Sequence, residues 1–200
     1  MKRANNRNRE NILSAALELF KAQSYDEVTI SDICKAAGCS NSTFYYQFGT
    51  KENLACSYME YTELIREDVL AQLLSETRNM EKLWLIHETI ISKCMELGPS
   101  LYGRICFLNL QSGAFSPENT NTKDSVERLL IPLIKQGQKN GEIRNHSTAE
   151  SIAHSVSALT TGAALMWCVS NGSYDLMQNV KFHLSNLYDL RDDLRISEAY

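Results

Sequence analysis

The residue types with the clearest binding chemistry lie together between Gly38 and Lys51, in the run GCSNSTFYYQFGTK. The run contains no acidic residue, and its polar side chains are mostly short hydroxyls, amides and phenols. Amides carry the paired donor and acceptor that match an adenine edge, and phenols reach phosphates or thymine methyls. This chemistry indicates contact with double-stranded DNA, through Arg7, Thr29, Ser31, Ser40, Asn41, Ser42, Thr43, Tyr45, Tyr46, Gln47 and Lys51.

Two short helices are predicted to present this run. Thr29 and Asp32 have the spacing of a capping box, so a helix is expected over residues 30–37, ended by Gly38. Ser40 is expected to cap a second helix over residues 41–48. Thr29 is open to two interpretations, since it can serve as a cap alone or also donate to a phosphate.

The second helix is predicted to divide by face. Phe44 and Phe48 are four residues apart and should point into a small core, whereas Tyr46 should point outward. Residues 7–22 follow the 3.6-residue period and supply a helix against which the pair packs. Lys51 is at the start of the next helix, where the dipole favours acids, so we expect a DNA phosphate in front of it. The whole forms a helix-turn-helix.

The remainder of the chain reads as helices, and no strand pattern is visible. We therefore predict an all-α protein of about nine helices, with an N-terminal helix-turn-helix domain over residues 1–50 and a helical domain over residues 51–200. The expected helices of the second domain cover residues 51–77, 79–97, 100–112, 123–140, 147–171 and 174–190, with a polar loop over 116–122.

Charge separates the two parts. Residues 1–51 contain seven basic and five acidic residues, a net charge of +2, which leaves −6 for the remainder of a chain whose total is −4. A basic DNA-binding head on an acidic body fits this asymmetry. A solvated basic tail would explain the charge equally well without the helix pair.

Other classes of protein receive little support. The sequence lacks a phosphate loop, G-x-S-x-G and H-E-x-x-H, so we expect neither an enzyme nor a metal or cofactor site. Six cysteines without a C-x-x-C pattern indicate reduced thiols in the cytoplasm. Residues 151–174 carry no Asp, Glu, Lys or Arg, but their His, Ser and Thr content favours a helix buried in protein over a membrane span.

The run from Thr29 to Leu54 resembles the signature of TetR-family (tetracycline-repressor-like) transcriptional regulators. The likeness rests on Thr and Asp-Ile in one helix, Gly-x-Ser at the turn, Tyr-Tyr-x-Phe in the next helix and Lys-Glu-x-Leu after it. It implies a homodimeric, all-helical repressor that binds a palindromic operator and responds to a small molecule. The chain departs from the usual pattern at Ser24, where the family has Gly, at Asn41-Ser42 and at Gln47. A left-handed Ser would cost about 1 kcal/mol relative to Gly, so the corner at Ser24 should be built differently.

The resemblance gives the acidic body two expected tasks. An apolar or aromatic effector is expected among Trp84, His87, Ile91, Cys94, Tyr102, Cys106, Phe107 and Asn109, although a plain core would use the same residues. A twofold interface is expected at Ala158, Thr161, Gly162, Leu176, Val180, Leu184 and Leu187, although these could also pack inside one subunit. The helix over residues 51–77 would then carry a change of tilt from effector to DNA.

An alternative keeps DNA binding but replaces the effector by oxidation. Cys94, Cys106 or Cys168 would then be a redox-sensing thiol, although none has basic neighbours in the sequence. The operator, the regulated genes, the identity of the effector and the sign of regulation do not follow from the sequence.

Overall fold

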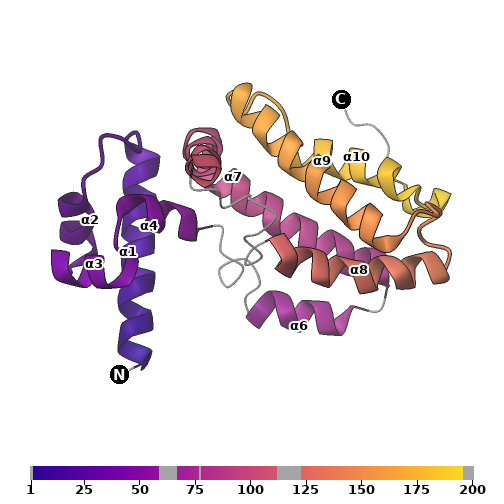
Figure 1. Cartoon of the computed structure of the whole chain (residues 1–200), viewed down its shortest axis with the longest axis horizontal. Coiled ribbons are helices and arrows are strands. Elements are labelled where there is room, and N and C mark those ends of the chain that lie inside the picture. The colour runs from indigo at the N-terminus through magenta and orange to yellow at the C-terminus, as the bar shows by residue number, and fades with distance from the viewer. Residues whose placement is uncertain (1, 59–66, 77, 112–122, 196–200) are drawn as a thin grey trace.

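The computed structural model describes residues 2–58, 67–76, 78–111 and 123–195, and the side chains of residues 2–6, 67–68 and 123–125 are outside the description. In these ranges the chain is helical, with no strand beyond the isolated bridge between Ile143 and Leu190. The all-α prediction is confirmed. A head and a body lie at opposite ends of the molecule and meet where α4 approaches α7 (Figure 1).

The head contains α1 (Lys2–Ala22), α2 (Ile30–Ala37), α3 (Asn41–Phe48) and α4 (Lys51–Ser57). Its core forms where α1 packs on α2, α2 on α3 and α3 on α4, and the side chains of Ile12, Phe44 and Leu54 are inaccessible to solvent. The Tyr58 hydroxyl donates a 2.6 Å hydrogen bond to the Leu13 carbonyl and ties the end of α4 to α1. Burial of a Phe, Leu or Ile side chain stabilises such a core by about 1.5–3 kcal/mol each.

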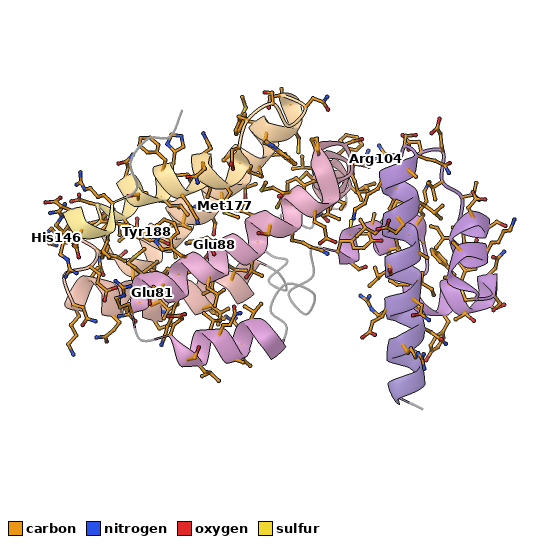
Figure 2. The ribbon with its side chains drawn as sticks, turned by 180° about the vertical axis from the view of Figure 1, so that it is seen from behind. Glu81, Glu88, Arg104, His146, Met177 and Tyr188 are labelled. Carbon is orange, nitrogen blue, oxygen red and sulfur yellow. The ribbon has the colours of Figure 1, made fainter. Side chains whose placement is uncertain are left out.

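The body contains α6 (Glu67–Ser75), α7 (Asn79–Gln111), α8 (Lys123–Lys139), α9 (Ala149–Val169), α10 (Leu176–Tyr188) and a 3-10 turn, Asp192–Leu194. Helices α7, α8, α9 and α10 pack against one another around a core that includes Leu83, Ile134 and Val156. Within it the His87 imidazole Nε2 and the Tyr188 hydroxyl are 2.9 Å apart. Figure 2 shows Tyr188 within the bundle.

Helix α7 is two helices joined by a sharp break. Gly98 has φ 76° and ψ 161°, a conformation that is essentially restricted to glycine, and Pro99 follows it. The predicted boundary between helices 79–97 and 100–112 is therefore confirmed, with continuation of the chain in a new direction. The two parts are called proximal α7 (79–97) and distal α7 (99–111) below.

The single helix predicted over residues 51–77 is not seen as one element. Described helix ends at Ser57 in α4 and begins again at Glu67 in α6, and the predicted continuity through residues 59–66 lies outside the described residues. The predicted loop over residues 116–122 also lies outside them.

Candidate nucleic-acid interface and effector cavity

Helix α3 divides by face as its sequence predicts. Phe44 is 0% exposed and Phe48 is buried, and their rings lie 5.7 Å apart between centroids. The Tyr46 side chain is 77% exposed and Tyr45 is 52% exposed. Two large aromatic side chains in water cost hydrophobic stabilisation, so they indicate a binding surface.

The start of α3 is closed by its own hydroxyls. The Ser40 Oγ accepts a 3.1 Å hydrogen bond from the Thr43 backbone N–H and lies 2.9 Å from the Thr43 Oγ1. Asn41 and Ser42 follow the cap and are exposed. Because both are short, the backbone of the first turn can approach another molecule closely.

Thr29 forms the predicted capping box of α2. Its hydroxyl donates to Asp32 Oδ2 at 2.6 Å, and Asp32 N–H donates back to the Thr29 Oγ1 at 3.2 Å. This hydroxyl bond holds the pKa of Asp32 below its usual value. The Thr29 hydroxyl therefore already donates within the cap. Ser31, the other predicted donor at the start of α2, is exposed and lies outside the capping box.

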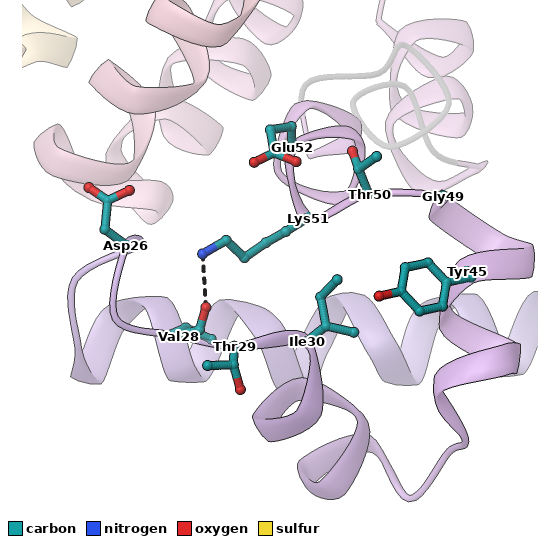
Figure 3. Close-up of a pocket in the computed structure, with 9 residues that line it drawn as sticks. All are labelled: Asp26, Val28, Thr29, Ile30, Tyr45, Gly49, Thr50, Lys51 and Glu52. Atoms are coloured by element: carbon teal, nitrogen blue, oxygen red, sulfur yellow. Dashed lines mark hydrogen bonds between the residues drawn. The ribbon is translucent and has the colours of Figure 1, made fainter.

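An open groove of about 400 Å³ runs between the α1–α2 corner and the start of α4 (Figure 3). Its lining combines hydroxyl groups, backbone and two carboxylates: Asp26, Val28, Thr29, Ile30, Tyr45, Gly49, Thr50, Lys51 and Glu52. The Tyr45 hydroxyl points across this groove toward Ile30 in Figure 3. The groove adjoins the exposed face of α3 and extends the polar surface along the head.

Lys51 has partners within the head that its sequence position does not predict, and its contact with a phosphate stays a prediction. Its ammonium donates to the carbonyls of Tyr25 and Val28, both at 2.9 Å, and lies 4.3 Å from the centroid of the Tyr25 ring. These contacts explain why a lysine is tolerated at the positive end of α4, since two carbonyl dipoles compensate its charge. The ammonium points toward the α1–α2 corner within the open groove (Figure 3).

The corner between α1 and α2 differs from a glycine-dependent turn, as expected from Ser24. Ser24 is absent from the described non-glycine residues with positive φ, which are Asn171 and Asp189. Instead, the Ser24 N–H donates to Glu27 Oε2 at 3.2 Å, and the Glu27 N–H donates to the Ser24 carbonyl at 3.1 Å. A side chain therefore closes the turn without backbone strain.

A small cavity of about 20 Å³ lies in the body between α7, α8 and α9. It is lined by His87, Ile90, Ile91, Val126, Leu130, Val156, Ser157 and Thr160. Burial lowers the pKa of His87 to about 4, so its imidazole is neutral at pH 7. The cavity therefore offers apolar surface and a few neutral polar groups.

The predicted effector residues are only partly brought together. His87 and Ile91 line the cavity, whereas Trp84, Cys94, Tyr102, Cys106, Phe107 and Asn109 do not. Phe107 is exposed on distal α7, with the Arg104 guanidinium 5.5 Å from its ring centroid. After the break at Gly98, distal α7 runs in a direction that does not line the cavity. Ile90, Val126 and Thr160, which were not predicted, line it instead.

The predicted dimer residues also separate into two groups. Leu176, Val180 and Leu184 are buried, because this stripe of α10 packs on α7 and α9 of the same chain, and Leu187 also packs against that core. Within the single chain these side chains therefore follow the alternative of packing inside one subunit. Ala158, Thr161 and Gly162 are exposed on α9.

Helix α9 has an exposed apolar face that the prediction did not include. Leu165, Met166 and Val169 are exposed, with Val169 at 80%. They extend the three-to-four-residue spacing of Ala158 and Thr161, a signal visible in the sequence. By length and composition alone α9 could cross a membrane, and only 28% of its most apolar window is buried. Within the single chain, the expected burial of this helix in protein is therefore only partial.

The head was compared with known protein families. Residues 12–56, which include the helix-turn-helix and the start of α4, match the model of bacterial regulatory proteins of the tetR family. The chain is a TetR-family regulator.

Relatives of this TetR-family chain include curated transcriptional repressors. It is 24% identical over 165 residues to the repressor ComR of Escherichia coli K12, covering 78% of each chain. It is 22% identical to the repressor BepR of Brucella suis, covering 84% of each. These relatives are DNA-binding regulators, and the chain is a DNA-binding regulator of this family and not an enzyme.

Solved structures share the fold. The fatty acid degradation regulator FadR of Bacillus halodurans superposes with a TM-score of 0.66 and 19% identity, covering 90% of this chain and 94% of that one. FadR of Thermus thermophilus, solved with lauroyl-CoA, superposes with a TM-score of 0.64 and 22% identity, covering 96% of this chain and 97% of that one. At these identities the likeness establishes the all-helical fold.

The redox alternative for this TetR-family chain is not supported. Burial raises the pKa of Cys94 to about 12 and of Cys168 to about 11, and it also raises the pKa of Cys106. Redox-sensing thiols have lowered pKa values because the thiolate is the reacting form. The described residues contain no group of three or more potential metal ligands.

Proposed function

We propose that this protein is a ligand-responsive, homodimeric repressor that inserts α3 into successive major grooves of a palindromic operator. The observation that carries the proposal is the division of α3, with Phe44 buried and Tyr46 exposed. Asn41 and Gln47 supply base-edge chemistry, and Tyr46 supplies a ring and a hydroxyl. Arg7, Ser31, Ser42 and Tyr45 supply the surrounding polar contacts, with residues 1–50 as the DNA-binding domain and residues 51–200 as the domain for effector and dimer.

The exposed face of α9 supports the dimer. Ala158, Gly162, Leu165 and Val169 form a stripe at helical spacing, and a Cβ built on Gly162 meets no atom within 4 Å. A flat apolar stripe with a glycine near its centre permits close helix approach. A twofold axis would place this face against its own copy, which removes the apolar surface from water in both subunits.

The cavity supports an uncharged, apolar or aromatic effector. His87 is neutral there, and Ser157 and Thr160 supply the remaining polar groups, so no cavity-lining charge would pair with a charged ligand. A drug-sized ligand needs about 300–1,000 Å³, far more than the cavity offers. The effector can therefore enter only a state in which α7, α8 and α9 have moved apart.

That requirement supplies the regulatory mechanism. A ligand shifts an equilibrium by its differential affinity for two states, and here one state has no room for it. Two recognition helices engage successive major grooves only when they are about 34–36 Å apart. Separation of the body helices would change that distance, and the protein would dissociate from its operator. Both states belong to a protein of the cytoplasm.

A mobility-shift assay with the DNA upstream of its own gene, at stated salt, tests the proposal. We expect a shifted complex with wild-type protein and at least a tenfold loss of affinity for Tyr46→Ala. Sedimentation of the same samples should give a dimer. Unaltered affinity of Tyr46→Ala, or a monomer bound to a single half-site, would contradict the proposal.

A further inference from the structure

Distal α7 carries a side chain that contacts the head, in addition to the packing of α7 against α1 and α4. The Arg104 guanidinium lies 5.3 Å from the centroid of the Tyr25 ring, and its Nη2 donates to Asp26 Oδ1 at 3.3 Å. Tyr25 and Asp26 form the corner between α1 and α2, which belongs to the head. In Figure 2 Arg104 lies at the end of the body that faces α1.

The same corner is held from within the head by Lys51. The Tyr25 ring thus has two cations near it, the Lys51 ammonium at 4.3 Å and the Arg104 guanidinium at 5.3 Å. Tyr25 is buried and also contacts Phe20, with centroids 5.2 Å apart. Among the described residues none hydrogen-bonds the Tyr25 hydroxyl, so the aromatic ring is the part that is held.

Distal α7 is in turn fixed against α9. A Cβ built on Gly103 would lie 3.5 Å from the Cβ of Cys168, so the two helices are in close contact one residue before Arg104. Proximal α7 carries the cavity residues His87 and Ile91 on the other side of the break at Gly98. One helix therefore connects the cavity, the exposed face of α9 and the head.

We propose that Arg104 is a positioning residue, which holds the α1–α2 corner through Tyr25 and Asp26 and so sets the distance between the two DNA-binding heads of a dimer. The inference rests on the proposed homodimeric operator binding and adds the residue that fixes its geometry. Movement of proximal α7 about Gly98 displaces Arg104, and the head follows through the contacts of Arg104 with Tyr25 and Asp26.

The interaction is of moderate strength, which suits a regulatory contact. Asp26 is mostly exposed and Arg104 is partly exposed, so the ion pair is screened, and the cation over the Tyr25 ring adds to it. Together they should bias the orientation of each head by about fivefold to tenfold. A bias of this size favours one spacing of the heads and still allows an effector to reverse it.

Spacing selectivity gives the test. Duplexes that bind wild-type protein are recovered from a random pool, and their spacer between half-sites is then lengthened or shortened by one base pair. Wild-type protein should bind the altered duplexes less tightly. Arg104→Gln should reduce this discrimination by about fivefold, whereas Arg104→Lys, which keeps a cation, should restore part of it.

Two controls separate positioning from stability. Lys135→Gln removes an exposed 2.7 Å ion pair to Glu150 within the body and should leave spacing discrimination unchanged. Tyr25→Phe keeps the ring and should behave as wild type, whereas Tyr25→Leu should resemble Arg104→Gln. A purely structural role of Arg104 would weaken binding to all spacings by the same factor, and that result would overturn the inference.

The outcomes also distinguish the inference from the proposed function. If wild-type protein selects no duplex, or binds every spacing equally, the proposed homodimeric operator binding fails and the positioning role fails with it. If wild-type protein discriminates and Arg104→Gln discriminates equally well, only the positioning role is wrong.

Discussion

Replacement of Lys51 by Met tests whether its ammonium supports the head or contacts DNA. The substitution keeps the aliphatic stem and removes the donors to the Tyr25 and Val28 carbonyls and the cation near the Tyr25 ring. A hydrogen bond from a charged donor contributes about 1.5–3 kcal/mol and a cation over an aromatic ring about 0.5–1 kcal/mol. Because Lys51 is only partly buried and the contacts are not additive, we expect a loss of about 2–3 kcal/mol in the free energy of unfolding.

Thermal unfolding followed by circular dichroism measures the loss. For a chain of this size a loss of about 2–3 kcal/mol corresponds to a fall in Tm of about 4–12 °C. Lys35→Met, which changes an exposed lysine of the same head, is the matched control and should alter stability by about 0.5 kcal/mol or less.

The salt dependence of DNA binding decides between the two roles. Below the Tm of the variant, the slope of log K against log salt should equal that of wild type if the two carbonyls remain the partners of the Lys51 ammonium in the complex. A slope smaller by about one, with unchanged stability, would show that Lys51 neutralises a phosphate and does not stabilise the head.

Three further predictions concern α3, the dimer face and the buried histidine. Tyr46→Ala should leave the Tm within about 2 °C of wild type and reduce operator affinity at least tenfold in a mobility-shift assay. Phe44→Ala should lower the free energy of unfolding by about 3–5 kcal/mol in thermal unfolding, because its ring is 0% exposed. Val169→Glu should convert the dimer to a monomer in sedimentation, since it places a charge on an exposed apolar face, and a persistent dimer would exclude this face. His87 has a folded pKa of about 4 against 6.5 in the unfolded chain, so the unfolded state takes up the proton first as pH falls. The stability of wild type relative to His87→Gln should therefore decrease by about 3 kcal/mol between pH 6.5 and 4 in urea unfolding, and a pH-independent difference would contradict a neutral buried His87.

Local signals in the sequence predicted the head well. The spacing of Phe44 and Phe48, the capping box at Thr29 and the glycine at position 38 each describe a contact within four residues along the chain. Such contacts depend on helix geometry, which is the same in every protein. The break at Gly98 followed from the same kind of reasoning, because Gly and Pro restrict the backbone locally.

Long-range contacts explain the errors. The leucine stripe of α10 has helical spacing, but periodicity does not say whether its partner is the same chain or another copy. The dipole of its own helix predicts an anion near Lys51, but it does not predict the two carbonyls 23 and 26 residues earlier that accept from its ammonium. Phe107 was placed in the cavity because it is aromatic, and the direction of distal α7 after Gly98 puts it outside. The Arg104 contact joins residues 78 positions apart and has no local signature.

A footprint of the protein on its selected operator tests the central claim most directly. We expect two protected half-sites related by a twofold axis, with centres about 10 base pairs or a multiple apart on one face of the duplex, and no protection by Tyr46→Ala at the same concentration. A single protected half-site, or protection that Tyr46→Ala reproduces, would contradict it.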